Sequence, residues 1–518
     1  MRADDLPLYY NAVDILERNL PERADKIALC SDARTLRFGE VGAEVNQVGQ
    51  ALRAMDVRFG ESVALLALDG AEWVTSFFGI LKIGAIAASL NTLLTGEEYA
   101  YILRDCRARV LIVDGMILPR ILELRAELRH LEHIVVIGAG EALPEGAIAF
   151  EDWIADRPTR LEAVQTHRDD YCCLNYSSGT TGDPKGILHA HKDLPLTAQL
   201  WGVNVLGLTE SDRTFAVAKL FFTFGTGGNL IFPWYVGASV VLYPGPPRLA
   251  DKVLEHIARY QPTILYNAPT GYGMMLAMPE LCERWDLSSL RLCVSAGESL
   301  PAPIWEAWKA RTGLDIIDGI GSTENYHIFL SNRPDDIRPG SSGKPFDGYA
   351  LRIVDEAGTP LPVGEVGNLL VKGETAALSY LHQYGRSKEA FIGAWLNTGD
   401  KYRIDADGYY WHCGRSDDML KVGGIWVSPV EVESALLSHP AVQECAVIGR
   451  SDDRELVKPQ AFVVLAEGHA ASAALEAEII GHCRDQMAEY KRPRWVTFID
   501  ELPKTATGKI QRFRLRAS

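Results

Sequence analysis

Short apolar runs alternate with helix-spaced segments through the first half of the chain. The runs at 62–68, 109–115 and 133–140 have the length of buried strands, whereas residues 37–56 carry apolar side chains at helical spacing. Parallel strands need a crossover of roughly a dozen residues, usually a helix, so this alternation favours βαβ units and parallel sheets. The pattern returns at 73–91 (a helix, a glycine break and a strand), 239–245, 262–269 and 290–298. We therefore predict an α/β fold whose large N-terminal domain contains two stacked βαβ-rich lobes.

The pattern changes after residue 340. Residues 351–374 contain short alternating runs interrupted by Gly and Pro, which indicates antiparallel strands and predicts a β-barrel-like subdomain. A charged run at 415–418 precedes a new α+β pattern. Its expected elements are a helix from Val430 to Ser438, strands at 444–450 and 460–466, and a long helix around 472–490. We predict an N-terminal domain over 1–416 and a small α+β C-terminal domain over 417–518, an α+β multidomain arrangement overall.

Charge and composition exclude several classes of protein. The net charge is −16 without a visible basic stripe, which argues against a nucleic-acid partner. No apolar run approaches the ~18–20 residues of a bilayer span, and the acidic N-terminus lacks the apolar segment of a signal peptide. We expect no membrane insertion and a cytoplasmic location, in keeping with nine cysteines that form no C-x-x-C pair. His189 and His191 share a strand face, and we interpret them as ordinary imidazoles rather than zinc ligands.

The loop at 176–186, YSSGTTGDPKG, combines three glycines, four Ser or Thr hydroxyls and one lysine. Bare backbone N–H groups, hydroxyl donors and a positive charge are the groups that hold phosphate. The P-loop pattern G-x-x-x-x-G-K-[ST] is not met, because Pro184 stands where the second glycine belongs and Gly186 follows Lys185. A plain surface hairpin is the alternative, but it does not require this set of side chains. We predict a strand–loop–strand phosphate site, with strands at 172–176 and 186–191.

The loop resembles the phosphate signature of the acyl-adenylate-forming enzymes, the superfamily of acyl-CoA synthetases, nonribosomal adenylation domains and firefly luciferase. The resemblance covers the chain through further motifs in the family's order: GIGSTE (319–324), NTGD (397–400), GRSDDMLKVGGIWVSP (414–429) and PKTATGKI (503–510). It implies that a carboxylate attacks the α-phosphate of ATP to give an acyl-adenylate, and that a thiol then displaces AMP. The implied cofactors are ATP, Mg²⁺ and coenzyme A.

The motifs of the resemblance imply a role for each matching residue. The residues expected on the β- and γ-phosphates are Ser177, Thr180, Thr181 and Lys185. Those expected on adenine and ribose are Gly297, Glu298, Asp318, Asp400 and Arg415. Glu324 is the expected Mg²⁺ ligand, with Thr323 on the α-phosphate. Where many members carry a tyrosine before G-x-T-E, this chain has Ile320, a feature shared with the aryl-CoA ligase branch.

The C-terminal domain has implied roles as well. Lys509 resembles the adenylation lysine, a point charge that bridges carboxylate and α-phosphate oxygens in the transition state. Asp417 resembles the hinge about which this domain rotates as a mobile lid. The rotation is expected to withdraw Lys509 and to present the loop with Gly423 and Gly424 to coenzyme A.

Two stretches, 219–229 and 320–329, resemble benzoate-type ligases more than fatty-acyl or acetyl ones. Aromatic walls and a glycine floor make a flat slot that suits a ring, although ordinary core packing is the alternative for the phenylalanines. The implied acid pocket is Thr223, Phe224, Thr226, Gly297, Gly321, His327 and Ile328. Benzoate ligases of this type carry Ala-Tyr where this chain has Thr223-Phe224, which favours 2-aminobenzoate (anthranilate), then benzoate, then hydroxybenzoates.

Other functions on the same fold stay open at this point. An adenylation enzyme that loads an aryl acid onto a carrier-protein pantetheine shares the first half-reaction. A non-catalytic binding protein would be expected to lose at least one of Lys185, Glu324, Asp400, Arg415 and Lys509, all of which are present. A luciferase-type oxidoreductase is a further option as a side activity. The expected partners are an aryl acid, ATP and coenzyme A, with the protein a monomer or homodimer.

Overall fold

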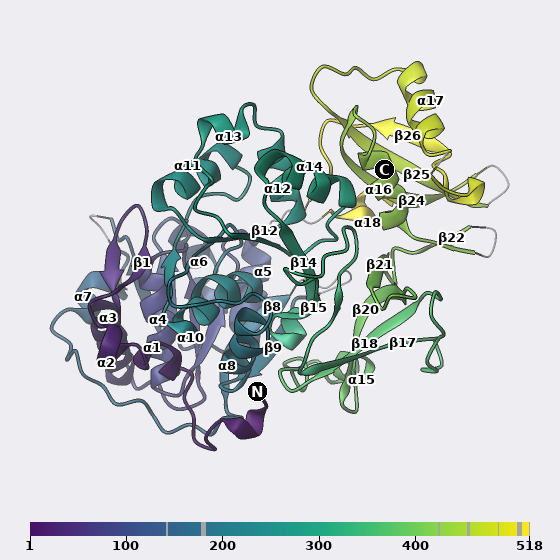
Figure 1. Ribbon diagram of the computed structural model, residues 1–518. Coiled ribbons are helices and arrows are strands. Elements are labelled where there is room, and N and C mark those ends of the chain that lie inside the picture. Colours follow the sequence, from purple (N-terminus) through teal and green to yellow (C-terminus); the bar gives the residue numbers. More distant parts are fainter. Residues whose placement is uncertain are drawn as a thin grey trace.

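The computed structural model describes residues 1–140, 143–177, 183–422, 425–452, 456–484, 486–504 and 510–516. Parallel sheets dominate the N-terminal part, and a smaller unit at the C-terminus lies above the antiparallel sheet of β17, β18 and β20 (Figure 1). In the described ranges, no helix is both long and apolar enough to cross a bilayer.

The first sheet carries the predicted phosphate loop at its edge. Its strands lie in the order β7-β6-β5-β3-β4-β8-β9 and run in parallel except for β9, which is antiparallel to β8. The bounds are β3 Ser62–Leu66, β4 Ile86–Ser89, β5 Val110–Asp114, β6 His133–Ile137, β7 Ala147–Ala149, β8 Tyr171–Ser177 and β9 Lys185–Ala190. The helices that connect or cover them include α3 Phe38–Ala54, α4 Ala71–Lys82 and α5 Gly96–Asp105. The break predicted within 73–91 lies at Gly84, whose φ of +74° ends the helix before β4.

The second sheet confirms the second predicted lobe. Its order is β16-β15-β14-β13-β12-β10-β11-β1-β2. The bounds are β1 Ile27–Cys30, β2 Thr35–Arg37, β10 Arg213–Ala216, β11 Ser239–Val241, β12 Ile264–Asn267, β13 Leu292–Ser295, β14 Ile316–Gly321, β15 Ile328–Ser331 and β16 Lys344–Pro345. Helices α11 Ala250–Tyr260, α12 Pro269–Leu276 and α14 Ala302–Thr312 follow successive strands. One hydrophobic core joins the lobes, and within it Phe78 stacks on Trp234 with ring centroids 5.4 Å apart.

Residues 217–238 form an insertion between β10 and β11, two strands that are neighbours in the second sheet. β10 and β11 are parallel neighbours, with Arg213 opposite Ser239. The excursion between them consists of α9 (Thr223–Thr226), η4 (Gly227–Ile231) and α10 (Phe232–Val236). It contains the segment in which the sequence predicts much of the acid pocket.

The antiparallel sheet predicted after residue 340 has the order β17-β18-β20-β19, with β21 paired to β20. Its bounds are β17 Tyr349–Val354, β18 Gly367–Gly373, β19 Phe391–Ile392, β20 Trp395–Ile404 and β21 Tyr410–Arg415, and α15 covers Tyr384–Ala390. Because β21 ends at Arg415, this sheet leads directly into the predicted hinge.

The C-terminal residues build a separate hydrophobic core around Val432, Leu436, Val447, Val463 and Ile479. Its strands are β22 Leu420–Val422, β23 Ile425–Val427, β24 Val442–Ser451, β25 Val457–Leu465 and β26 Trp495–Phe498, and its helices are α16 Pro429–Leu437, α17 Ala473–His482 and α18 Arg512–Arg516. The helix predicted around 472–490 is therefore too long.

The physical reason for the shorter helix lies in the segment after α17. Gly481 weakens the last turn of the helix. Arg492 then donates hydrogen bonds to the carbonyls of Met487 and Arg484, which hold the chain in turns.

Candidate active site

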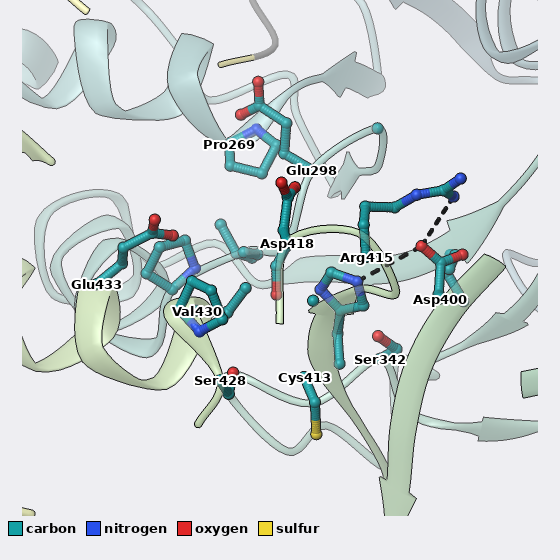
Figure 2. A pocket seen from close by; sticks show the side chains of 18 of the residues that line it. Pro269, Glu298, Ser342, Asp400, Cys413, Arg415, Asp418, Ser428, Val430 and Glu433 are labelled. Atoms are coloured by element: carbon teal, nitrogen blue, oxygen red, sulfur yellow. Dashed lines mark hydrogen bonds and ion pairs between the residues drawn. The ribbon is translucent and has the colours of Figure 1, made fainter. Parts of the chain in front are cut away.

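A cavity of about 1040 Å³ lies between the N-terminal part and the C-terminal unit. Figure 2 shows Asp400 and Arg415 on one side of it and Val430 and Glu433 of α16 on the other. The predicted site residues among its lining are Ser177, Lys185, Gly297, Glu298, Asp318, Gly321, Glu324, Asp400 and Arg415. Three different sheets thus bring the expected phosphate, metal, adenine and ribose residues to one space.

The predicted phosphate residues Ser177 and Lys185 line the cavity at the ends of β8 and β9. They pair with each other across the two strands, which confirms the strands predicted on either side of the loop. Lys185 Nζ lies 3.7 Å from Glu324 Oε1, so the predicted phosphate lysine and metal ligand are neighbours. Thr180 and Thr181 lie outside the described residues.

Glu324 has a second partner that the sequence analysis missed. The Tyr380 hydroxyl donates to Glu324 Oε1 over 2.8 Å, and Lys185 Nζ lies 4.6 Å from the centre of the Tyr380 ring. Burial and the charge of Glu324 raise the pKa of the Tyr380 phenol, so it stays a neutral donor at physiological pH. Tyr380 comes 56 residues after Glu324 and stands in no recognised motif, so only the folded chain reveals the contact.

The carboxylate of Glu324 suits Mg²⁺, which prefers hard oxygen donors. Within the described ranges, no three His, Cys, Asp or Glu side chains come together as a metal site. A magnesium ion at Glu324 would therefore take its other ligands from nucleotide phosphates and water, as Mg²⁺ usually does. Thr323 precedes Glu324 in the short helix η5 (Thr323–Asn325), beside the cavity-lining Ser322.

The predicted ribose residues face each other across paired strands. Asp400 on β20 lies opposite Arg415 on β21, and Arg415 Nη1 donates to Asp400 Oδ1 over 3.0 Å. The same nitrogen lies 3.1 Å from the carbonyl of Thr398, and the charge of Asp400 raises the pKa of the Arg415 guanidinium. Gly399 has a φ of +75°, and a Cβ there would come within 2.9 Å of Arg415 Nη2. This turn therefore needs glycine to place the carboxylate against its cation.

The predicted adenine residues Gly297, Glu298 and Asp318 also line the cavity. Asp318 lies on β14, and burial raises its pKa to about 8, so it is largely protonated at neutral pH. Its Oδ1 has no hydrogen-bond partner among the described residues. Glu298 Oε2 accepts a hydrogen bond from the Thr270 hydroxyl over 2.6 Å. A protonated carboxyl group with one unpartnered oxygen can donate to or accept from a nucleobase edge.

Among the predicted acid-pocket residues, His327 contacts Phe224 directly. Its Nε2 faces the carbonyl of Phe224 at 3.3 Å, and its ring centre lies 5.5 Å from that of Phe224. The ring centres of Trp201 and Phe232 lie 5.1 and 4.6 Å from that of His327, so three aromatic side chains surround the imidazole. Trp201 and Phe232 were not among the predicted pocket residues. Because Nε2 must donate to the carbonyl, Nδ1 is the acceptor nitrogen, and it has no partner in the described part of the chain.

The pocket residues differ in their relation to the cavity. Gly297 and Gly321 line it, whereas Thr223, Phe224, Thr226, His327 and Ile328 lie outside its lining. The connection between the two groups is Gly321, which pairs with Ile328 across β14 and β15. The Thr226 hydroxyl donates to the carbonyls of Leu220 and Phe222, so it serves the local fold.

The predicted hinge is tied to the last helix. Arg516 Nη2 donates to the carbonyl of Asp417 over 3.2 Å and to the carboxylate of Asp418. Arg512 Nη2 bridges both oxygens of Glu433 at 2.7 Å. Gly423, Gly424 and Lys509 lie outside the described residues, but Lys504 and Ile510, which flank the segment of Lys509, line the cavity.

Comparisons with known proteins identify the family of this chain. The family model "AMP-binding enzyme" matches residues 16–381, and the model "AMP-binding enzyme C-terminal domain" matches residues 431–509. The crystal structure of the anthranilate CoA ligase AuaEII in complex with anthranoyl-AMP is 67% identical, with a TM-score of 0.97 over 100% of this chain and 98% of that one.

Curated relatives include two ligases for different acids. The benzoate–CoA ligase of Thauera aromatica is 45% identical over 100% of this chain and 97% of its own length. The anthranilate–CoA ligase of Pseudomonas aeruginosa is 34% identical over 91% of this chain and 89% of its own length.

Proposed function

The chain belongs to the AMP-binding enzyme family as an ATP-dependent aryl-CoA ligase, and from that premise we propose that 2-aminobenzoate is the acid it prefers. In the first half-reaction a carboxylate oxygen forms a bond to the α-phosphorus of ATP, and the bond to the bridging oxygen breaks with release of pyrophosphate. In the second, the sulfur of coenzyme A attacks the acyl carbon, its proton passes to solvent, and AMP leaves with the electron pair of the broken bond.

The choice of acid rests on the likeness to the 67% identical anthranilate ligase. The unpartnered Nδ1 of His327 supports it, because an ortho-amino group carries N–H donors for such a buried acceptor, whereas unsubstituted benzoate carries none. Thr223, buried at the start of α9 next to Phe224, is a further polar residue of the predicted pocket. Benzoate is the second candidate, favoured by the 45% identical benzoate ligase.

The roles proposed for the site residues rest on their motifs and, for the cavity-lining ones, on their places around the cavity. We assign Ser177, Lys185, Thr180 and Thr181 to the departing phosphates, and Asp400 with Arg415 to the ribose hydroxyls. Gly297, Glu298 and Asp318 hold adenine, and Thr323 contacts the α-phosphate. Glu324, oriented by Tyr380, holds Mg²⁺. When bound, the ion neutralises charge on the phosphates and thereby lowers the barrier to attack by a second anion.

The C-terminal unit acts as a lid in this proposal. Its separate core supports a division of the chain into 1–416 and 417–518, with rotation at Asp417. Lys509 serves adenylate formation, since the flanking Lys504 and Ile510 line the cavity. Gly423 and Gly424 then serve the transfer to coenzyme A. We further propose a cytoplasmic monomer or homodimer, consistent with nine free cysteines, each within the described part of the chain.

A panel of carboxylic acids tests the proposed substrate. Release of AMP is followed with ATP, Mg²⁺ and coenzyme A, for 2-aminobenzoate, benzoate, the hydroxybenzoates and a medium-chain fatty acid. We expect the highest kcat/KM for 2-aminobenzoate, with benzoate about ten-fold lower for the loss of one buried hydrogen bond. A fatty acid as the best substrate would contradict the aromatic pocket.

The competing acceptors and a non-catalytic role are separated in the same assay. Replacing coenzyme A by a pantetheinylated carrier protein tests the carrier-loading alternative, which predicts faster acyl transfer to the carrier. A non-catalytic protein predicts no dependence of ATP–pyrophosphate exchange on any aryl acid.

A further inference from the structure

His189 bridges the two segments that carry Lys185 and Glu324. It lies on β9, four residues after Lys185, with a side chain that is fully buried. Its Nδ1 lies 3.0 Å from Asp193 Oδ2, and its Nε2 lies 2.7 Å from the carbonyl oxygen of Thr323. That carbonyl belongs to the peptide bond between Thr323 and Glu324. The phosphate strand is therefore hydrogen-bonded directly to the backbone of the predicted metal ligand.

The chemistry of the two groups fixes which atom donates in the hydrogen bond between His189 and Thr323. The Thr323 carbonyl can only accept, so His189 Nε2 carries a hydrogen and donates it. Nδ1 then either donates to an ionised Asp193 or accepts from a protonated one. Asp193 is itself buried and receives the backbone N–H of Ala190 at 2.9 Å, which fixes its position. In both protonation states the imidazole is held by Asp193 and donates to Thr323.

The Thr323 carbonyl lies in a turn that contains an unfavourable backbone conformation at Tyr326. It also accepts the backbone N–H of Tyr326 at 3.0 Å, and Tyr326 has a φ of +68°, which is uncommon for a bulky residue. The ring of Tyr326 meets His189 edge to face, with centroids 5.2 Å apart. The hydrogen bond and this contact hold a strained backbone at the point from which Glu324 projects.

We propose that His189, oriented by Asp193, is a positioning residue that sets the spacing between Lys185 and the Thr323–Glu324 segment for adenylate formation. The inference rests on the proposed function, because it assigns these segments to ATP. Acyl transfer to coenzyme A starts from the adenylate, after the phosphates assigned to Lys185 have left, so we expect it to be independent of this spacing.

His191 provides a matched control two residues away. It is equally buried, but its Nδ1 accepts the backbone N–H of Ala12 at 3.0 Å, far from the cavity. Substitutions at His189 and His191 thus carry similar costs of burial, and only those at His189 break a bond to the site.

Replacing His189 with Gln or Asn tests its hydrogen bonds to Thr323 and Asp193 separately. In His189→Gln the amide nitrogen reaches the place of Nε2 and can still donate to Thr323. In His189→Asn the amide reaches only the place of Nδ1 and the bond to Thr323 is lost. The same pair is made at His191, and single-turnover rates of aryl-adenylate formation and of acyl transfer from supplied aryl-adenylate are measured for all four, with thermal midpoints.

We expect His189→Asn to slow adenylate formation at least about ten-fold with KM for the acid unchanged, and His189→Gln to recover most of that loss. The rate of acyl transfer from supplied adenylate should stay within about three-fold of the wild-type rate for all variants. The two His191 variants should keep the wild-type adenylation rate even where their thermal midpoints fall as far as those of the His189 variants. Equal losses in the two His189 variants, equal losses at His191, or a parallel loss of acyl transfer would overturn the proposal.

Asp193 keeps the test decisive if His189→Asn does not fold. Asp193→Asn retains a hydrogen-bonding partner for Nδ1 and should stay near the wild-type adenylation rate, whereas Asp193→Ala should lose about ten-fold. Equal rates in these two variants would refute the role of Asp193. If the wild-type protein itself shows no aryl-dependent adenylate formation, the proposed function fails, a result distinct from a wild-type rate that His189 variants leave unchanged.

Discussion

The carboxylate of Asp400 gives the sharpest test of the proposed nucleotide site. Asp400→Asn keeps the size of the side chain and removes its charge. Asp400 accepts a charged hydrogen bond from Arg415 at 3.0 Å. When the substitution removes the negative charge of Asp400, Arg415 still has its hydrogen bond to the carbonyl of Thr398. The substitution therefore leaves the strand pair intact and weakens what Asp400 offers to the ribose.

The magnitude follows from the difference between charged and neutral hydrogen bonds. A bond to an ionised group contributes about 1 kcal/mol more than a neutral one, and a carboxylate can accept from both vicinal ribose hydroxyls. Two such bonds amount to about 2 kcal/mol, or an increase of about 30-fold in KM for ATP. Because the acid binds elsewhere, its KM should stay within about two-fold of the wild type.

ATP–pyrophosphate exchange measures both constants: KM for ATP at saturating 2-aminobenzoate, and KM for the acid at saturating ATP. Asp407→Asn is the control, since its carboxylate forms an exposed pair with Arg338 at 3.1 Å and lies away from the cavity lining. A second comparison uses ATP that lacks the 3′-hydroxyl, which should weaken binding to the wild type far more than to Asp400→Asn. An unchanged KM for ATP, or an equal penalty for the deoxynucleotide in both proteins, would refute the ribose assignment.

Three further predictions concern the metal ligand, the lid and a buried acid. Glu324→Gln should lower the rate of adenylate formation about 100-fold and raise the Mg²⁺ concentration needed for half-maximal exchange; an unchanged Mg²⁺ dependence would argue against this ligand. Lys509→Ala should lower adenylate formation about 100-fold and spare acyl transfer from supplied adenylate. The control is Lys491→Ala, since Lys491 lies in the same unit, pairs with Glu431 and is outside the cavity lining; equal loss in both half-reactions of Lys509→Ala would contradict the rotating lid. Asp318 has a pKa raised from 3.8 to about 8, so the folded state keeps a proton that the unfolded state loses, and stability falls as pH rises through this window by up to about 1.4 kcal/mol per pH unit. Asp318→Asn should remove that loss, so its advantage in thermal midpoint should grow between pH 5 and pH 8, and parallel profiles would contradict the raised pKa.

The fold was predictable wherever local pattern and tertiary structure agree. The runs at 62–68 and 109–115 became β3 and β5 because a parallel strand buried on both faces must be apolar throughout. The helix expected around 472–490 failed because its apolar spacing continues past His482, whereas the backbone there follows turns held by Arg492. Such a side-chain contact leaves no periodic signal in the sequence.

The site was predictable where a motif and its contact coincide. Lys185, Glu324, Asp400 and Arg415 stand in motifs and meet at the cavity. Tyr380 and His189 also contact the site, but through partners far along the chain: Tyr380 contacts Glu324 and Lys185, and His189 contacts the carbonyl of Thr323. A single sequence shows which residues are present but gives little information on contacts between residues far apart in the chain. The contacts of Tyr380 and His189 with the site were therefore not predictable from it.

The excursion of residues 217–238 has a practical consequence for enzyme engineering. It begins and ends on the adjacent strands β10 and β11, and it carries Thr223 and Phe224. A saturation library confined to this insert can therefore vary which ring substituents are tolerated, while the strands proposed to contact ATP keep their register. Phe232 and Trp234 should be excluded from the randomised codons, since both are fully buried and Trp234 stacks on Phe78.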